Sequence, residues 1–141
     1  MASTEDIRGH YIKVNATRIF YDEIGEGCPI VCVHTAGACS LEYTYLLPLL
    51  AERGFHAYAL DLPGHFRSYP VNWKPHRTIH EHAEFVHAFA NTLGLKKPVI
   101  MGCSIGGTSR STTPRTIGAR WPREYRWRVC HARQPFRAPP E

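Results

Sequence analysis

The sequence predicts an α/β fold in which a leading antiparallel hairpin is followed by parallel strands joined by helices. Residues that favour β-structure flank a short turn at Asn15-Ala16, which indicates the hairpin. Short continuous apolar runs, typical of strands buried on both faces, then alternate with helical patterns. The order strand, helix, strand, helix, strand requires parallel pairing with right-handed crossovers.

The strands are expected in two groups. Residues 11–14 and 17–21 are the two arms of the hairpin. The three apolar runs that follow are each expected to form a buried strand, at residues 29–34, 55–61 and 98–101.

The first helix is expected to begin at Ser40, whose side chain can serve as the N-cap, and to end at Arg53 before Gly54. Pro48 lies inside this pattern. Because proline removes a helical hydrogen bond, we expect a kink or a helix in two parts.

The second helix opens with a capping box formed by Thr78 and Glu81 and ends at Gly94. Apolar residues at helical spacing give it one buried face. Several titratable side chains cluster near it, but metal ligands must converge on one point. We therefore expect a solvated helix face for His76, His80, His82, His87, Glu81 and Glu84.

Composition indicates one soluble domain. The chain has 141 residues, 43% of them hydrophobic and 21% charged. It contains no run of about 18 apolar residues, and its acidic N-terminus lacks the apolar core of a secretion signal, so neither a membrane span nor secretion is expected. The 5 cysteines include no C-x-x-C pair, which is typical of free thiols in a reducing compartment. A cytoplasmic location is therefore expected.

The positive charge belongs to the C-terminal segment alone. Residues 1–107 hold 9 Lys and Arg against 10 Asp and Glu, whereas residues 108–141 hold 8 Arg against 2 Glu. That segment also has 5 prolines and no leucine, so it is expected to be irregular and disordered. We expect two parts: an incomplete domain over residues 1–107 and a basic tail over residues 108–141. The arginines could bind nucleic acid electrostatically, but without a fold to present them no specific nucleic-acid binding is expected.

The third buried strand leads into a short motif that carries chemistry. Gly102-Cys103-Ser104-Ile105-Gly106 fits the pattern G-x-S-x-G. In such an elbow a strained backbone projects the serine Oγ above the sheet, and side chains at the two glycine positions would collide with the flanking elements. The alternative is a Gly-Ser turn at a strand end with no chemistry.

Together with two further motifs, residues 9–107 resemble the α/β-hydrolase superfamily. His34-Thr35-Ala36-Gly37 resembles the family's oxyanion loop, and residues 61–68 resemble its D-x-P-G-x-G-x-S loop, with Phe66 where the family usually has glycine. The resemblance implies a partial α/β-hydrolase fold that ends at the nucleophile elbow. Asp61 is expected to organise its loop rather than to serve as a catalytic acid, and Cys103 is expected to be a packed structural thiol.

The resemblance also implies roles in catalysis. Ser104 would be the nucleophile, and the backbone N–H groups of Ile105 and Ala36, or less readily Thr35, would form the oxyanion hole. The implied reaction is acyl transfer through an acyl-enzyme, usually hydrolysis of a small-molecule ester, although some relatives cleave carbon–carbon bonds. No cofactor or metal is expected.

The family's catalytic acid and histidine both follow the elbow, and serine is a poor nucleophile without a base. Here only Glu124, His131 and Glu141 follow Ser104, and none of them comes after a strand-like run. We therefore expect an inactive chain, an N-terminal portion of a hydrolase that is truncated or frameshifted after Gly107. The alternative is a non-catalytic fragment that acts as an interaction module.

Two further expectations follow from this interpretation. If the frame shifts after Gly107, another reading frame of the coding DNA should encode an apolar helix, a later acid and a later histidine. Residues 99–101 would form an uncovered apolar strand edge, which invites aggregation or self-association.

Overall fold

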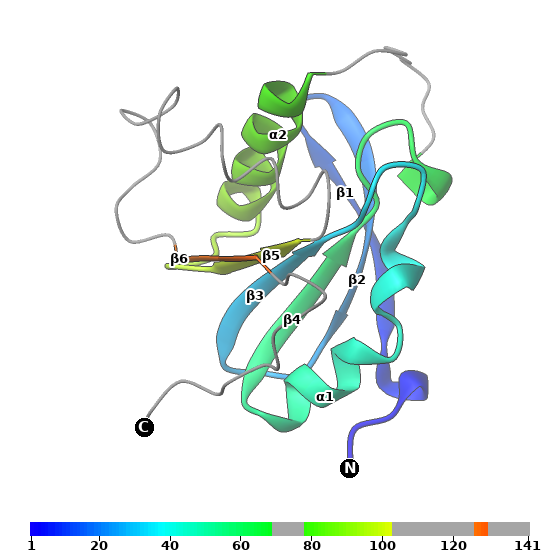
Figure 1. The fold of residues 1–141 in the computed structure, drawn as a ribbon, viewed down its shortest axis with the longest axis vertical. Coiled ribbons are helices and arrows are strands. Elements are labelled where there is room, and N and C mark those ends of the chain that lie inside the picture. Colours follow the sequence, from blue (N-terminus) through cyan, green and yellow to red (C-terminus); the bar gives the residue numbers. More distant parts are fainter. Residues whose placement is uncertain (69–77, 103–125, 130–141) are drawn as a thin grey trace.

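The computed structural model describes residues 1–68, 78–102 and 126–129 of the chain. Its centre is a mixed sheet with the strand order β1-β2-β4-β3-β5-β6 (Figure 1). The strands are β1 (Arg8–Val14), β2 (Thr17–Ile24), β3 (Cys28–Val33), β4 (Phe55–Leu60), β5 (Val99–Gly102) and β6 (Arg126–Val129). β1, β2 and β4 are joined by antiparallel pairing, and β4, β3, β5 and β6 by parallel pairing. The predicted α/β class is confirmed.

The hairpin is confirmed with the predicted two-residue turn. Val14 pairs with Thr17, and the residues between them, Asn15 and Ala16, have φ values of 46° and 64°. Positive φ at both central positions is the mark of a type I′ turn, whose twist matches that of the flanking strands.

The first helical segment is divided, as Pro48 predicted. A 3-10 turn, η2 (Ser40–Tyr43), precedes the helix α1 (Leu46–Glu52). Pro48 is tolerated in the first turn of α1, where the backbone N–H groups have no intrahelical partner. The prediction that Ser40 caps this segment is wrong: Cys39 is the N-cap residue, and the Ser40 hydroxyl donates instead to Asp22 Oδ2 at 2.8 Å.

The second helix, α2 (Ile79–Thr92), has the predicted capping box. Glu81 N–H donates to Thr78 Oγ1 at 3.2 Å, and Thr78 N–H donates to Glu81 Oε2 at 2.7 Å. The expected solvated histidine face is wrong for His82, which is 6% exposed and belongs to the buried side of the helix. His80 does pair across the surface with Glu84 at 3.4 Å.

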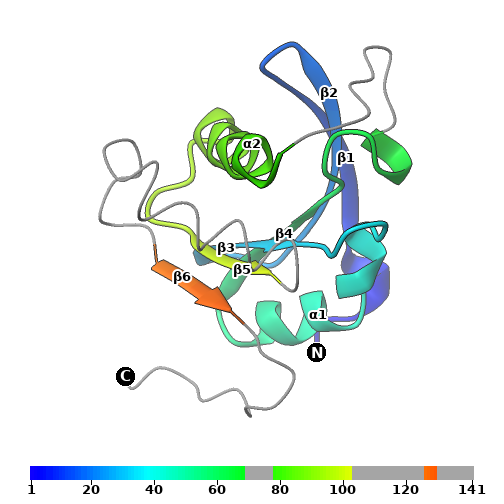
Figure 2. The same cartoon turned by 45° about the horizontal axis from the view of Figure 1, so that its top comes forward.

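Helices cover both faces of the sheet (Figure 2). α2 covers one face, where its apolar residues pack on Tyr21, Val31 and Leu60. η2 and α1 cover the other, where Tyr43, Leu47 and Leu50 pack on the opposite side of the same strands. Because β3 and β4 are buried on both faces, their apolar runs show no alternation, as expected for parallel strands. Two more 3-10 turns complete the described part, η1 (Thr4–Asp6) and η3 (Phe66–Ser68).

The expectation that β5 forms an uncovered sheet edge is wrong. β6 pairs with β5 in parallel, with Val99 opposite Arg126 and Gly102 opposite Val129. This strand lies within the segment 108–141 that was expected to be irregular, and it ends two residues before His131, so the expectation that His131 does not follow a strand is also wrong. Among the described residues, no helix is both long enough and apolar enough to cross a membrane.

Candidate active site

The candidate site lies at the edge of the sheet where the parallel strands β3, β4 and β5 end. Val33 pairs with Leu60 on one side and with Gly102 on the other, so these three strands end at the same level. The loops that follow β3 and β4 meet at this edge, where open α/β sheets bind their ligands. Three of the predicted site residues, Ser104, Ile105 and Gly106, lie outside the described residues.

The predicted oxyanion loop, residues 34–37, follows β3 and forms a tight turn. Ala38 N–H donates to the Thr35 carbonyl at 3.1 Å, and Gly37 at the third position has φ +73°, a conformation that favours glycine. Thr35 directs both its N–H (2.8 Å) and its hydroxyl (3.1 Å) to Glu42 Oε2. Ala36 N–H donates no hydrogen bond within the described ranges, so of the two candidate donors in this loop, Ala36 and Thr35, only Ala36 has an uncommitted amide.

His34 joins this loop to the loop that follows β4. Its side chain is completely buried. The ring accepts a hydrogen bond from Leu62 N–H at Nε2 (3.0 Å) and donates one from Nδ1 to the Thr35 carbonyl (2.7 Å). These partners require the neutral tautomer with the proton on Nδ1. Burial lowers the pKa of His34, opposed by the hydrogen bond to Thr35, while the neighbouring His65 ring at 4.8 Å lowers it further.

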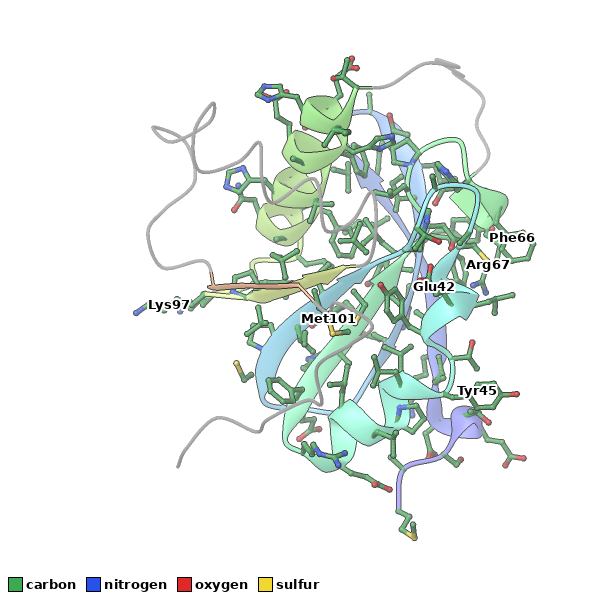
Figure 3. All side chains as sticks on the ribbon, viewed as in Figure 1. Glu42, Tyr45, Phe66, Arg67, Lys97 and Met101 are labelled. Carbon is green, nitrogen blue, oxygen red and sulfur yellow. The ribbon has the colours of Figure 1, made fainter. Side chains whose placement is uncertain are left out.

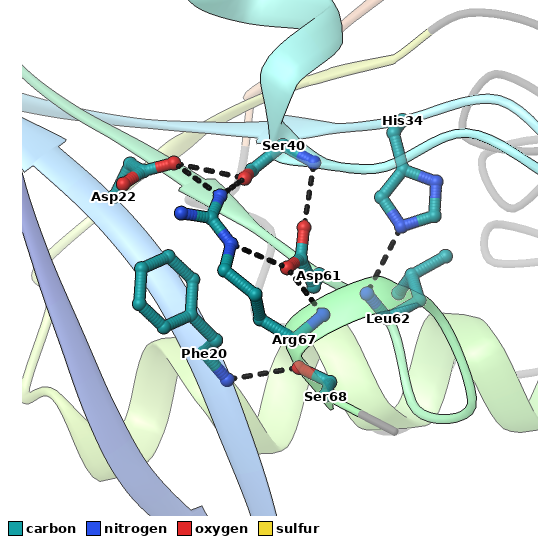
Figure 4. A network of polar contacts seen from close by, with 8 residues as sticks. All are labelled: Phe20, Asp22, His34, Ser40, Asp61, Leu62, Arg67 and Ser68. Atoms are coloured by element: carbon teal, nitrogen blue, oxygen red, sulfur yellow. Dashed lines mark hydrogen bonds and ion pairs between the residues drawn. The ribbon is translucent and has the colours of Figure 1, made fainter.

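Asp61 organises the loop after β4, as predicted, and also holds the loop after β3 (Figure 4). Its carboxylate is inaccessible to solvent and accepts three hydrogen bonds. Oδ1 accepts from Ser40 N–H at 2.6 Å, and Oδ2 accepts from the N–H and the Nε–H of Arg67 at 3.2 and 3.3 Å. One buried carboxylate therefore bonds Ser40 at the start of η2 and Arg67 in the middle of η3.

The network extends from Arg67 to the second arm of the hairpin (Figure 4). Arg67 Nη2 lies 2.9 Å from Asp22 Oδ2, and the guanidinium carbon lies 3.7 Å from the centre of the Phe20 ring. Ser68 Oγ accepts from Phe20 N–H at 2.8 Å. The hairpin is thus bonded to the loop that carries the D-x-P-G-x-G-x-S resemblance, which explains why the serine of that motif is buried.

Phe66, which stands where the family pattern has glycine, has a backbone conformation that favours glycine. Its φ is +37°, in the left-handed region where glycine is unstrained and a bulky residue is not. The residue is 57% exposed, and in Figure 3 its side chain points to the same side of the view as that of Arg67. The Arg67 guanidinium carbon lies 5.1 Å from its ring centre.

Within the described residues, no group of three or more His, Cys, Asp or Glu side chains could hold a metal ion. The nearest approach to a cluster at this edge is the run of rings His34, His65 and His82, with neighbouring centroids 4.8 and 6.3 Å apart. His34 has both ring nitrogens engaged by backbone groups, so the run does not converge on one point.

Fold and sequence together define the class of protein. A family model described as alpha/beta hydrolase fold matches residues 29–109, which include the loop after β3, the loop after β4 and the elbow motif. The chain therefore belongs to the α/β-hydrolase fold family.

Individual relatives agree with this assignment. The AB hydrolase superfamily protein YisY of Bacillus subtilis (strain 168) is 33% identical over 101 residues, which cover 70% of this chain and 37% of YisY. The structure of the epoxide hydrolase CorEH superposes with a TM-score of 0.66 at 27% identity, over 77% of this chain and 37% of that one. A membrane phospholipase A superposes with a TM-score of 0.72 at 24% identity, over 82% of this chain and 37% of that one, which shows a shared fold. The chain thus spans about 37% of the length of each of these relatives.

Proposed function

We propose that this chain carries the nucleophile half of a serine hydrolase site that acts on esters or related acyl compounds. Ser104 is the nucleophile, and the N–H groups of Ile105 and Ala36 hold the oxyanion. The observation that carries the proposal is the uncommitted Ala36 N–H in a loop where His34 engages the Thr35 carbonyl, Glu42 engages the Thr35 N–H and Asp61 engages the Ser40 N–H. The family assignment and the G-x-S-x-G motif that begins at Gly102, the last residue of β5, support it.

The proposed chemistry is acyl transfer in two steps. Ser104 Oγ attacks the substrate carbonyl carbon and loses its proton to a base, while two N–H donors stabilise the tetrahedral oxyanion. Collapse of this intermediate expels the leaving group and leaves an acyl ester on Ser104, which water then hydrolyses. Removal of one such donor costs about 3 kcal/mol of barrier in other hydrolases.

A serine at the elbow favours acyl substrates over the substrates named for some structural neighbours. Attack of a serine on an epoxide or a haloalkane carbon would leave a serine ether, which water does not readily cleave. Attack on an acyl carbon leaves an ester, which water cleaves in the second step. Epoxide hydrolysis, for which CorEH is named, is therefore not carried over to this chain.

The second part of the proposal concerns the base and the acid of the triad. After Ser104 the sequence holds one histidine, His131, and two acids, Glu124 and Glu141, in a segment rich in arginine and proline. We propose that none of these completes a triad and that the chain alone does not turn over esters.

The test uses a fluorophosphonate probe on the full chain, followed by peptide mass spectrometry, beside hydrolysis of p-nitrophenyl acetate. We expect slow labelling confined to Ser104 and lost in Ser104→Ala, and an ester hydrolysis rate equal to that of this variant. Labelling spread over other serines would refute the elbow nucleophile. Turnover that disappears in Ser104→Ala would instead show that the chain is active.

A further inference from the structure

The N–H groups of residues 35–40, in and just after the oxyanion loop, divide into three that donate hydrogen bonds and three that donate none within the described ranges. Hydrogen bonds engage the N–H groups of Thr35, Ala38 and Ser40. Within the described ranges, the N–H groups of Ala36, Gly37 and Cys39 donate none. The hydrogen bond of the Thr35 N–H matters most for the site. Without it, the Thr35 amide would compete with Ala36 as the oxyanion donor.

Glu42 is the side chain that engages Thr35. A single carboxylate oxygen, Oε2, accepts both the Thr35 N–H at 2.8 Å and the Thr35 hydroxyl at 3.1 Å. Two bonds from one residue to one oxygen fix the direction of that peptide group more firmly than either bond alone. The two other acids beside this segment, Asp61 and Asp22, engage Ser40 instead.

The segment that carries Glu42 is itself fixed to the sheet. Glu42 N–H donates to the Cys39 carbonyl at 3.0 Å within η2. On one side Ser40 N–H is held by the buried Asp61, and on the other the Tyr43 hydroxyl donates to the Val33 carbonyl at 2.8 Å. Contacts to the ends of β3 and β4 therefore fix the backbone that carries Glu42, while the residue itself is exposed and reaches Thr35 with its carboxylate.

We propose that Glu42 is a positioning residue of the oxyanion loop, which withdraws Thr35 N–H and leaves Ala36 N–H as the donor. This inference rests on the proposed function, because it assigns a role within the same site. The loop is positioned by the acceptor oxygen of Glu42, and the negative charge of the carboxylate is not required. A full negative charge next to a developing oxyanion is unfavourable, so a neutral acceptor at this position would hold the loop equally well.

The experiment measures amide hydrogen exchange by NMR on the ¹⁵N-labelled full chain and three variants. In the wild type we expect Thr35 N–H to exchange about tenfold more slowly than Ala36 N–H, the effect of one hydrogen bond. Glu42→Ala should remove that protection, whereas Glu42→Gln, which keeps an acceptor oxygen, should retain it. Glu52→Ala, at an exposed acid of α1, is the matched control and should change neither amide.

A second readout separates positioning from a merely structural contact. Phosphonylation of Ser104 should slow about tenfold in Glu42→Ala and not in Glu42→Gln, as expected if about one hydrogen bond of positioning is lost.

Equal exchange of Thr35 and Ala36 in the wild type, or an unchanged Thr35 amide in Glu42→Ala, would overturn the inference. So would equal phosphonylation rates for Glu42→Ala and the wild type. If the wild type is not phosphonylated at Ser104 at all, the serine hydrolase proposal fails. The exchange pattern then still decides whether Glu42 holds the loop, so the two failures are distinguishable.

Discussion

At the scale of single residues, the site depends on side chains whose hydrogen-bonding capacity is fully used. His34 accepts at Nε2 from Leu62 and donates at Nδ1 to Thr35, so its neutral form joins two loops. Protonation at Nε2 would replace an acceptor with a donor facing the Leu62 N–H. The His34 ring therefore holds the loops after β3 and β4 together only in its neutral form, with a single proton on Nδ1.

This arrangement predicts a pH dependence of stability. Burial holds the folded-state pKa of His34 below its ordinary value of about 6.5, so the unfolded chain binds the proton more tightly. The stabilising contribution is complete above that ordinary value and is lost as the pH falls towards the folded-state pKa. We expect the difference in unfolding free energy between wild type and His34→Gln to shrink on acidification, as measured by urea denaturation at several pH values. A difference that is constant between about pH 7.5 and about pH 5 would contradict the assignment.

Some residues of the site were predictable from sequence, and others could not have been. The turn at Ala36 and Gly37 and the role of Asp61 follow from local motifs, because glycine at positive φ and an acid before a turn leave a local signal. Glu42 and Asp22 carry no such signal. Glu42 matters because η2 folds back on the loop, and Asp22 because β2 passes beside η3.

At the scale of elements, the loops after β3 and β4 behave as one unit because Asp61 holds both. Its two oxygens bond Ser40 in one loop and Arg67 in the other, 27 positions apart in the chain and joined by a fully buried carboxylate. Breaking a buried ion pair by removing the charge of one partner leaves the other charge uncompensated.

We expect Asp61→Asn to lower the free energy of unfolding by about 2 kcal/mol, since Arg67 loses one of its two carboxylate partners and keeps Asp22, and one backbone donor then faces an amide NH₂. Urea denaturation followed by circular dichroism measures this loss. Asp6→Asn is the matched control, because Asp6 is exposed and bonds only its neighbour Ser3. Equal stabilities of the two variants would show that the buried carboxylate does not hold the loops.

The sequence also predicts the elements better than their ends. The capping box of α2 and the two-residue hairpin turn are local and were predicted correctly. The expected cap at Ser40 failed because the hydroxyl finds Asp22 and Arg67, which come from distant segments. His82 was placed on the wrong side because its neighbours His80 and Glu84 are polar, whereas tertiary packing buries His82.

At the scale of the whole molecule, the edge strand of the sheet next to β5 is β6, which was not predicted from the sequence. Arg126–Val129 carries two arginines in four residues and has no apolar run, yet it pairs along the whole length of β5. A short strand of this composition shows no alternation of apolar and polar residues from which it could be predicted. Its pairing depends on a neighbouring apolar strand, here β5, whose backbone N–H and C=O groups are free to bond.

Removal of β6 should therefore leave β5 at the edge of the sheet, unpaired on its outer side. We expect a chain lacking residues 126–141 to scatter more light than the full chain at equal concentration, because β5 then presents unpaired N–H and C=O groups. A chain lacking only residues 130–141 keeps β6 and is the control. Equal scattering from the two shortened chains would show that β6 does not protect this edge.

The strand order also has a consequence for synthesis on the ribosome. β1 and β2 can pair as soon as both have emerged, but the next strand made, β3, does not pair with either of them. Its first partner is β4, which is complete only when Leu60 has emerged, and its second is β5. At about 5–20 residues per second the apolar strand Cys28–Val33 waits for seconds without a partner. During this interval the unpaired apolar strand β3 is a segment to which chaperones can bind.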